Sequence, residues 1–205
     1  MRPSLPPVRW HLYLGSGTAA LAWLAVLWQG VLSTGSVANL LSYFTILSNL
    51  AVAGSLTLAL GWPTSALGRA SQRVSVQTAI ALYILVVALV YNTVLRGLLT
   101  LTGAAWIVDN LLHVVVPGSY LGYWYFVAQR GRLAWQAMVK WLGFPAGYLA
   151  YCLLRGPLVH WYPYPFLNVP QLGYAQVLGN SGLVLLCFLA GGAALIKLNH
   201  SLHKR

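Results

Sequence analysis

The sequence almost lacks acidic side chains. Asp109 is the single carboxylate side chain among 205 residues, against twelve Lys and Arg. Paired-carboxylate glycosidases, two-metal hydrolases and carboxylate-lined cation or proton pathways all need more acids than this, so these classes are excluded. Charged residues of either sign make up only 6% of the chain, whereas a soluble domain carries roughly 25%. The composition therefore predicts an integral membrane protein.

Cysteine is also scarce, and the histidines are scattered. Cys152 and Cys187 fall in apolar segments at different expected depths, which predicts two free thiols. His160 has no second metal ligand at a useful spacing. We therefore expect neither a metal site nor a cofactor.

The formal net charge of +11 does not indicate a nucleic-acid partner. The basic residues stand in the gaps between apolar runs, where membrane topology places them. A nucleic-acid interface needs a basic stripe on a soluble scaffold, which this sequence does not offer.

Six apolar runs organise the chain, each of about 20 to 27 residues and so long enough to cross a bilayer. They cover residues 11–32, 37–60, 74–95, 104–127, 133–154 and 172–198. The first run is too long for the apolar core of a signal peptide and lacks a small-x-small cleavage site. We expect a single all-α domain over residues 1–205, a polytopic protein with six transmembrane helices.

The basic residues predict the orientation of these helices. Nine of them mark one side: Arg2, Arg9, Arg69, Arg73, Arg130, Arg132, Lys197, Lys204 and Arg205. The opposite side has Arg96 and Arg155, and Lys140 lies within the fifth run. Because Lys and Arg concentrate in cytoplasmic loops, both termini are expected in the cytoplasm of a cell-membrane protein.

The fourth run carries the most unusual polar group. Asp109 and His113 stand at i and i+4, which places them on one helix face. Ionisable groups are costly at membrane depth, so this pair is a functional-site hypothesis. Pro117 has no N–H for the His113 carbonyl, so the helix should loosen there. Two alternatives remain open: Asp109 pairs with Arg96 instead, or Asn110 orients the imidazole.

Polar side chains of four helices fall at one depth. At about 1.5 Å per residue, Thr45 and His113 each lie roughly 12 to 14 Å below the outer surface, and Asn92 and Asn180 lie at a similar level. The second helix presents the densest polar stripe, made of Ser42, Thr45, Ser48 and Asn49. A hydroxyl near an imidazole with a neighbouring acid resembles nucleophile, base and orienting group. The alternative is that these Ser, Thr and Asn residues only bind helix carbonyls and pack helices together.

The outer loop around Tyr162–Leu167 is aromatic and contains two prolines, which fix φ. A lid or an apolar gate for lipid is one interpretation. A rigid cap lying on the membrane interface is the other, and we favour it.

Three motifs in order resemble the androgen-induced gene 1 / androgen-dependent TFPI-regulating protein family, and more closely its bacterial relatives. They are Ser42-Tyr43-Phe44-Thr45-Ile46-Leu47-Ser48-Asn49, the helix with Asp109, Asn110, His113 and Pro117, and the loop from Tyr162 to Leu167. The resemblance covers nearly the whole chain. It implies six spans and an intramembrane threonine hydrolase that cleaves lipid esters, namely fatty acid esters of hydroxy fatty acids. The family nucleophile matches Thr45 and the family histidine matches His113. Animal members carry an Asn-rich run where Asp109 stands here.

The expected function is therefore hydrolysis of a lipid or fatty-acyl ester in the outer half of the bilayer. Thr45 would attack, His113 would transfer protons, and Asp109 or Asn110 would orient the ring. The candidate oxyanion or substrate contacts are Ser48, Asn49, Asn92 and Asn180. A non-catalytic lipid-binding or transport protein that uses the same polar layer is the main alternative, and a structural subunit of a larger assembly is the third. The native substrate and the oligomeric state stay open.

Overall fold

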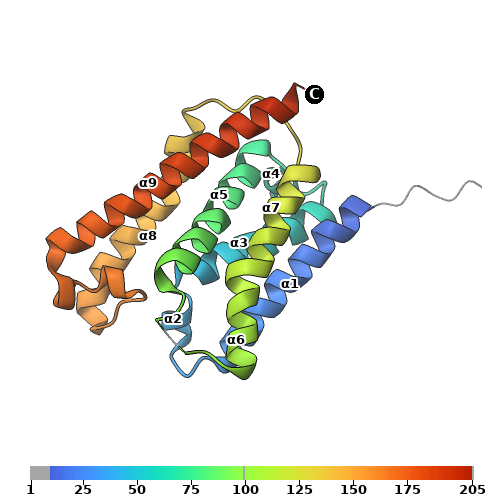
Figure 1. The fold of residues 1–205 in the computed structure, drawn as a ribbon. Helices are drawn as coiled ribbons and strands as arrows, with labels where there is room; N and C mark the ends of the chain where they lie inside the picture. The colour runs from blue at the N-terminus through green and yellow to red at the C-terminus, as the bar shows by residue number, and fades with distance from the viewer. Residues whose placement is uncertain (1–9, 99, 205) are drawn as a thin grey trace, which may run out of the picture.

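The computed structural model describes residues 10–98 and 100–204. These residues are helical and contain no strand (Figure 1). The elements are α1 (Trp10–Leu32), α2 (Val37–Leu40), α3 (Phe44–Gly61), α4 (Ala66–Ser71), α5 (Val74–Val90), the π turn η1 (Tyr91–Leu95), α6 (Gly103–Asn110), the π turn η2 (Leu111–Val115), α7 (Val116–Phe126), α8 (Ala137–Val159), the 3-10 turn η3 (Pro165–Leu167) and α9 (Val169–His203). Arg2, Arg9 and Arg205, which contribute to the predicted orientation, lie outside the described residues.

Five helices are long and apolar enough to cross a membrane: α1, α3, α5 continued by η1, α8 and α9. The all-helical class is therefore confirmed, and the length and apolar composition of these helices fit the predicted membrane protein. The fourth predicted run is helical from Gly103 to Phe126, but the π turn η2 divides it into three short pieces. Cys152 and Cys187 are free thiols, as predicted.

The prediction of one helix over residues 37–60 is wrong at its beginning. The helix breaks between α2 and α3, where Tyr43 has an extended backbone, so Ser42 lies in a turn and not on the helix face shared by Thr45. Side chains of α8 bind the open turn: the Tyr148 hydroxyl donates to the Ser42 carbonyl over 2.8 Å, and the Tyr151 hydroxyl lies 2.7 Å from the Ser42 hydroxyl. Irregular backbone at membrane depth needs such partners from the protein itself.

The predicted loosening beside Pro117 is confirmed. Its missing N–H and the π turn η2 leave the carbonyls of Leu112 and His113 without their usual helical donors. Asn49 of α3 donates to the Leu112 carbonyl over 3.3 Å, and Asn92 of η1 donates to the His113 carbonyl over 3.1 Å. Two amides from neighbouring helices thus hold the wide turn in place.

The core lies among α1, α3, α5 and α7, while α8 and α9 lie side by side on one flank (Figure 1). Fully buried Ala22, Ala25 and Ala53 let α1 and α3 approach closely, as small residues do between membrane helices. On the flank, Leu82 of α5 packs against Gly191 of α9. A Cβ added to Gly191 would lie 3.0 Å from Leu82 Cδ1. The broken second helix, the π turn and the flanking pair position the site described next.

Candidate functional site

Thr45 stands in the first turn of α3, one residue after the helix begins. The first backbone N–H groups of a helix have no partner within it, and the aligned peptide dipoles make this end partly positive. The Thr45 N–H donates to the Tyr164 hydroxyl over 3.2 Å. The helix break therefore places Thr45 at an electropositive helix end. An uninterrupted helix over residues 37–60 would have placed it in the helix interior.

His113 lies in the π turn η2 and faces Thr45. Its Nε2 is 3.4 Å from Thr45 Oγ1, and the residue is only 9% exposed. Its Nδ1 lies 2.9 Å from the backbone carbonyl oxygen of Asp109 and 3.1 Å from the Asp109 carboxylate. Because a carbonyl oxygen only accepts, Nδ1 carries the proton in the neutral ring and Nε2 is left as an acceptor. This is the tautomer that a general base toward the threonine hydroxyl requires.

The two open alternatives for Asp109 are resolved by its neighbours. Asp109 contacts the imidazole, whereas the Arg96 guanidinium donates to the Asn110 side-chain oxygen over 3.2 Å. Asn110 therefore does not orient His113 in this structure. The Tyr91 ring stacks on the imidazole, with centroids 3.5 Å apart and an angle of 10° between the planes. This stacking partner was not identified from the sequence.

The predicted asparagine contacts are structural in this arrangement. Asn49 Nδ2 binds the Thr45 and Leu112 carbonyls, and Asn92 Nδ2 binds the Ala88 and His113 carbonyls. A side-chain amide has two N–H groups, so neither retains a donor for an oxyanion. Asn180 lies farther away, where its Nδ2 donates to the Phe166 carbonyl over 3.0 Å and fastens the outer loop. The Ser48 hydroxyl is buried and has no hydrogen-bond partner within the described residues.

Tyr164 is the functional candidate that sequence reasoning missed. The favoured interpretation of its loop, a cap lying on the interface, does not describe this residue, because its side chain reaches inward to α3. Its hydroxyl accepts the Thr45 N–H and lies 3.3 Å from Thr45 Oγ1. Its ring stacks on Phe166 and meets the edge of Tyr43. Burial raises the pKa of Tyr164 to about 12, so the hydroxyl keeps its proton.

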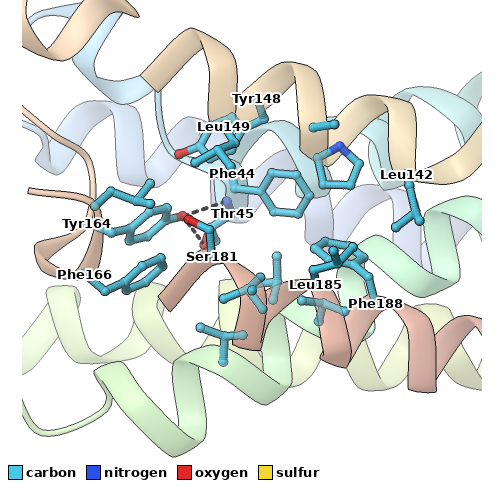
Figure 2. Close-up of a pocket in the computed structure, with 18 of the residues that line it drawn as sticks. Phe44, Thr45, Leu142, Tyr148, Leu149, Tyr164, Phe166, Ser181, Leu185 and Phe188 are labelled. Carbon is cyan, nitrogen blue, oxygen red and sulfur yellow. Dashed lines mark hydrogen bonds between the residues drawn. The ribbon is translucent and has the colours of Figure 1, made fainter. Parts of the chain in front are cut away.

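A pocket of about 380 Å³ ends at Thr45 and Tyr164 (Figure 2). Side chains from α3, α5, η1, α8, the outer loop and α9 form its wall, and most of them are aliphatic or aromatic. Thr45 and Tyr164 lie toward one end of the view, and Leu142 and Phe188 lie toward the other. The arrangement thus joins an apolar pocket to a hydroxyl, a correctly oriented imidazole and a second hydroxyl, which together suit acyl transfer.

Comparison with models of protein families, with curated proteins and with solved structures found no match to this chain. Within the described residues, no group of three or more His, Cys, Asp or Glu is placed to hold a metal ion. The site must therefore be interpreted from its own geometry.

Proposed function

We propose that this protein is an intramembrane threonine hydrolase of lipid esters, with six spans, cytoplasmic termini and its site in the outer half of the bilayer. The observation that carries the proposal is the 3.4 Å contact between Thr45 Oγ1 and His113 Nε2, the nitrogen that the Asp109 carbonyl at Nδ1 leaves as the acceptor. A base within hydrogen-bond reach of a hydroxyl, itself oriented by a third group, is the arrangement of an activated nucleophile. The resemblance to the androgen-induced gene 1 family adds fatty acid esters of hydroxy fatty acids as the substrate class.

The reaction follows from the contacts. Thr45 Oγ attacks the ester carbonyl while its proton passes to His113 Nε2, and the Asp109 carboxylate stabilises the imidazolium. The tetrahedral oxyanion accepts from the Tyr164 hydroxyl, at the positive end of α3. Collapse breaks the ester bond, His113 protonates the leaving alkoxide, and an acyl-threonine forms. Water then attacks the acyl-threonine with His113 as base, which releases the acid and restores Thr45.

The test is ester turnover by the purified protein in detergent. Thr45→Ala and His113→Ala should each lower kcat/KM by about 10²- to 10⁴-fold, the usual contribution of a nucleophile–base pair. Thr57→Ala is the matched control, because Thr57 lies on the same helix and its hydroxyl donates to the Ala53 carbonyl and accepts from the Trp23 indole, away from the site. A fluorophosphonate probe should label Thr45 in the wild-type protein only. Turnover of both variants at the wild-type rate would overturn the proposal.

A non-catalytic lipid-binding role is the second candidate, and the apolar wall of the pocket is the observation that favours it. It predicts that the ester is bound and recovered intact, and that the fluorophosphonate probe does not label Thr45. The same purified protein distinguishes the two functions.

A further inference from the structure

The pocket beside Thr45 is polar at one end only. Besides Thr45 and Tyr164, three residues with a hydroxyl line the pocket: Tyr91, Tyr148 and Ser181. Ser181 binds the Val177 carbonyl of its own helix, and Tyr148 binds the Ser42 carbonyl. The Tyr91 ring stacks on His113, which faces Thr45. The polar groups that a ligand meets therefore gather near Thr45 and Tyr164, and most of the remaining wall is apolar (Figure 2).

The dimensions suit a single narrow chain. On α9 the lining extends from Leu178 to Phe188, which is ten residue steps, or roughly 15 Å of helix axis at about 1.5 Å per step. The volume of about 380 Å³ lies near the lower limit of ligand sites, which hold roughly 300–1,000 Å³. Two acyl chains side by side, as in a diacyl glycerolipid, do not fit this space.

The pocket is open at α9. Leu178 is 54% exposed and Leu185 is 45% exposed, although both line the pocket, and Gly182 between them is exposed as well. In a bilayer these apolar surfaces face lipid, so a chain can enter from the membrane without passing through water. Gly182 leaves the opening wide, since an added Cβ there would meet no atom within 4 Å.

We propose that this pocket binds one unbranched acyl chain, which enters from the bilayer past Gly182. The carboxyl or ester end lies at Thr45 and Tyr164, and the terminal methyl points toward Leu142 and Phe188. The placement of a scissile ester at Thr45 rests on the proposed hydrolase function, whereas binding of the chain does not require catalysis. The pocket thereby holds the acyl chain of an ester and leaves no room for a second chain beside it.

The chain offers a matched pair of glycines for the test. Gly182→Leu adds a side chain at a position that lines the pocket, and Gly179→Leu adds the same side chain to the same helix at a position that does not line it. At both positions an added Cβ would meet no atom within 4 Å. Both changes raise helix propensity equally, so folding affects the two variants alike. Ser181→Leu, also in the pocket wall, provides a second obstruction in case Gly182→Leu does not fold.

The probe is decanoic acid that carries a diazirine at its terminal carbon. It is mixed with the full-length Thr45→Ala protein in detergent and photolysed, and the labelled residues are mapped by mass spectrometry. Labels should fall on pocket residues of α8 and α9. Excess decanoate should compete better than butanoate, because each further CH₂ that the pocket buries strengthens binding. Gly182→Leu should lower labelling at least about tenfold, which corresponds to about 1.4 kcal/mol, while Gly179→Leu should not.

Each outcome separates this inference from the proposed function. Equal labelling of the Gly182→Leu and Gly179→Leu variants, or labels spread over the lipid-facing helices, overturns the pocket assignment even if the wild-type protein hydrolyses esters. Selective labelling of Thr45→Ala combined with no ester turnover by the wild-type protein supports the chain site and overturns the hydrolase proposal.

Discussion

The imidazole of His113 has two nitrogens with different partners. The Asp109 backbone carbonyl alone fixes the proton on Nδ1, because it cannot donate. The Asp109 carboxylate adds a negative charge beside the same nitrogen, which favours the imidazolium formed during proton transfer. A single residue therefore orients the base through its backbone and supports its charged form through its side chain.

The Tyr164 hydroxyl is expected to matter for rate more than for binding. Tyr164→Phe keeps the ring against Phe166 and removes only the group that meets Thr45, so kcat should fall by about 10²-fold with little change in KM, as for loss of one oxyanion donor. The measurement is steady-state ester hydrolysis. Burial favours the neutral form and raises the pKa of Tyr164 to about 12, so the wild-type advantage over the variant should persist above the pKa of about 10 of an ordinary tyrosine.

The control for this experiment lies in the same loop. The Tyr162 hydroxyl is buried and has no hydrogen-bond partner within the described ranges, so Tyr162→Phe should leave the rate unchanged. An equal loss in both phenylalanine variants would mean that the loop, and not the Tyr164 hydroxyl, sets the rate.

At the scale of elements, three interruptions of helical structure build the site. The α2–α3 break exposes the helix end at Thr45, the π turn η2 turns His113 toward it, and the π turn η1 supplies Tyr91 and Asn92. Side chains of other helices bind the backbone groups that the α2–α3 break and η2 leave open, whereas in η1 the Asn92 and Thr93 side chains bind the Ala88 and Leu89 carbonyls of their own helix. Polar residues that the sequence suggested for catalysis therefore have a structural role.

Asn49 provides the clearest test of this structural role. Asn49→Ala removes the donor to the buried Leu112 carbonyl, so we expect a loss of about 1–3 kcal/mol of stability together with reduced activity as the π turn relaxes. Thermal unfolding in detergent measures the first effect. Ser16→Ala is the control, because the exposed Ser16 hydroxyl binds only carbonyls of its own helix. A variant at position 49 as stable as that control would show that the carbonyl does not depend on Asn49.

At the scale of the whole molecule, the number of spans decides where the termini lie. The long helices number five within the described residues, and the interrupted stretch Gly103–Phe126 completes six in our proposal. An even number places both termini on one side, and an odd number separates them. The positions of the two ends therefore test whether the stretch that carries His113 crosses the membrane.

We expect both ends in the cytoplasm of a bacterial expression host, because the basic residues concentrate on that side. Green fluorescent protein fused to either terminus should fluoresce, and alkaline phosphatase fused to either should be inactive. A chain truncated after Leu98, which ends beyond the third span, should give an active phosphatase as the control. Active phosphatase at the C-terminus of the full chain would contradict the six-span arrangement.

Composition and spacing alone were enough to predict the class of the molecule and the helix face that carries Asp109 and His113. A 6% charged composition and long apolar runs leave a helical membrane protein as the fitting class, because a bilayer accepts only internally satisfied backbone. The spacing of Asp109 and His113 placed them on one helix face and made their contact one of three alternatives, because i and i+4 residues are neighbours on a helix surface.

The surroundings of Asp109 and His113 depend instead on how distant parts of the chain pack. Tyr164 reaches Thr45 across 119 positions, and Arg96 binds Asn110 and leaves Asp109 to His113. The break before Phe44 likewise depends on hydroxyls from α8, far along the chain. Periodicity records only which residues share a helix face. The partner that satisfies an open carbonyl or a free helix end is chosen when distant helices pack, so sequence spacing gives no sign of it.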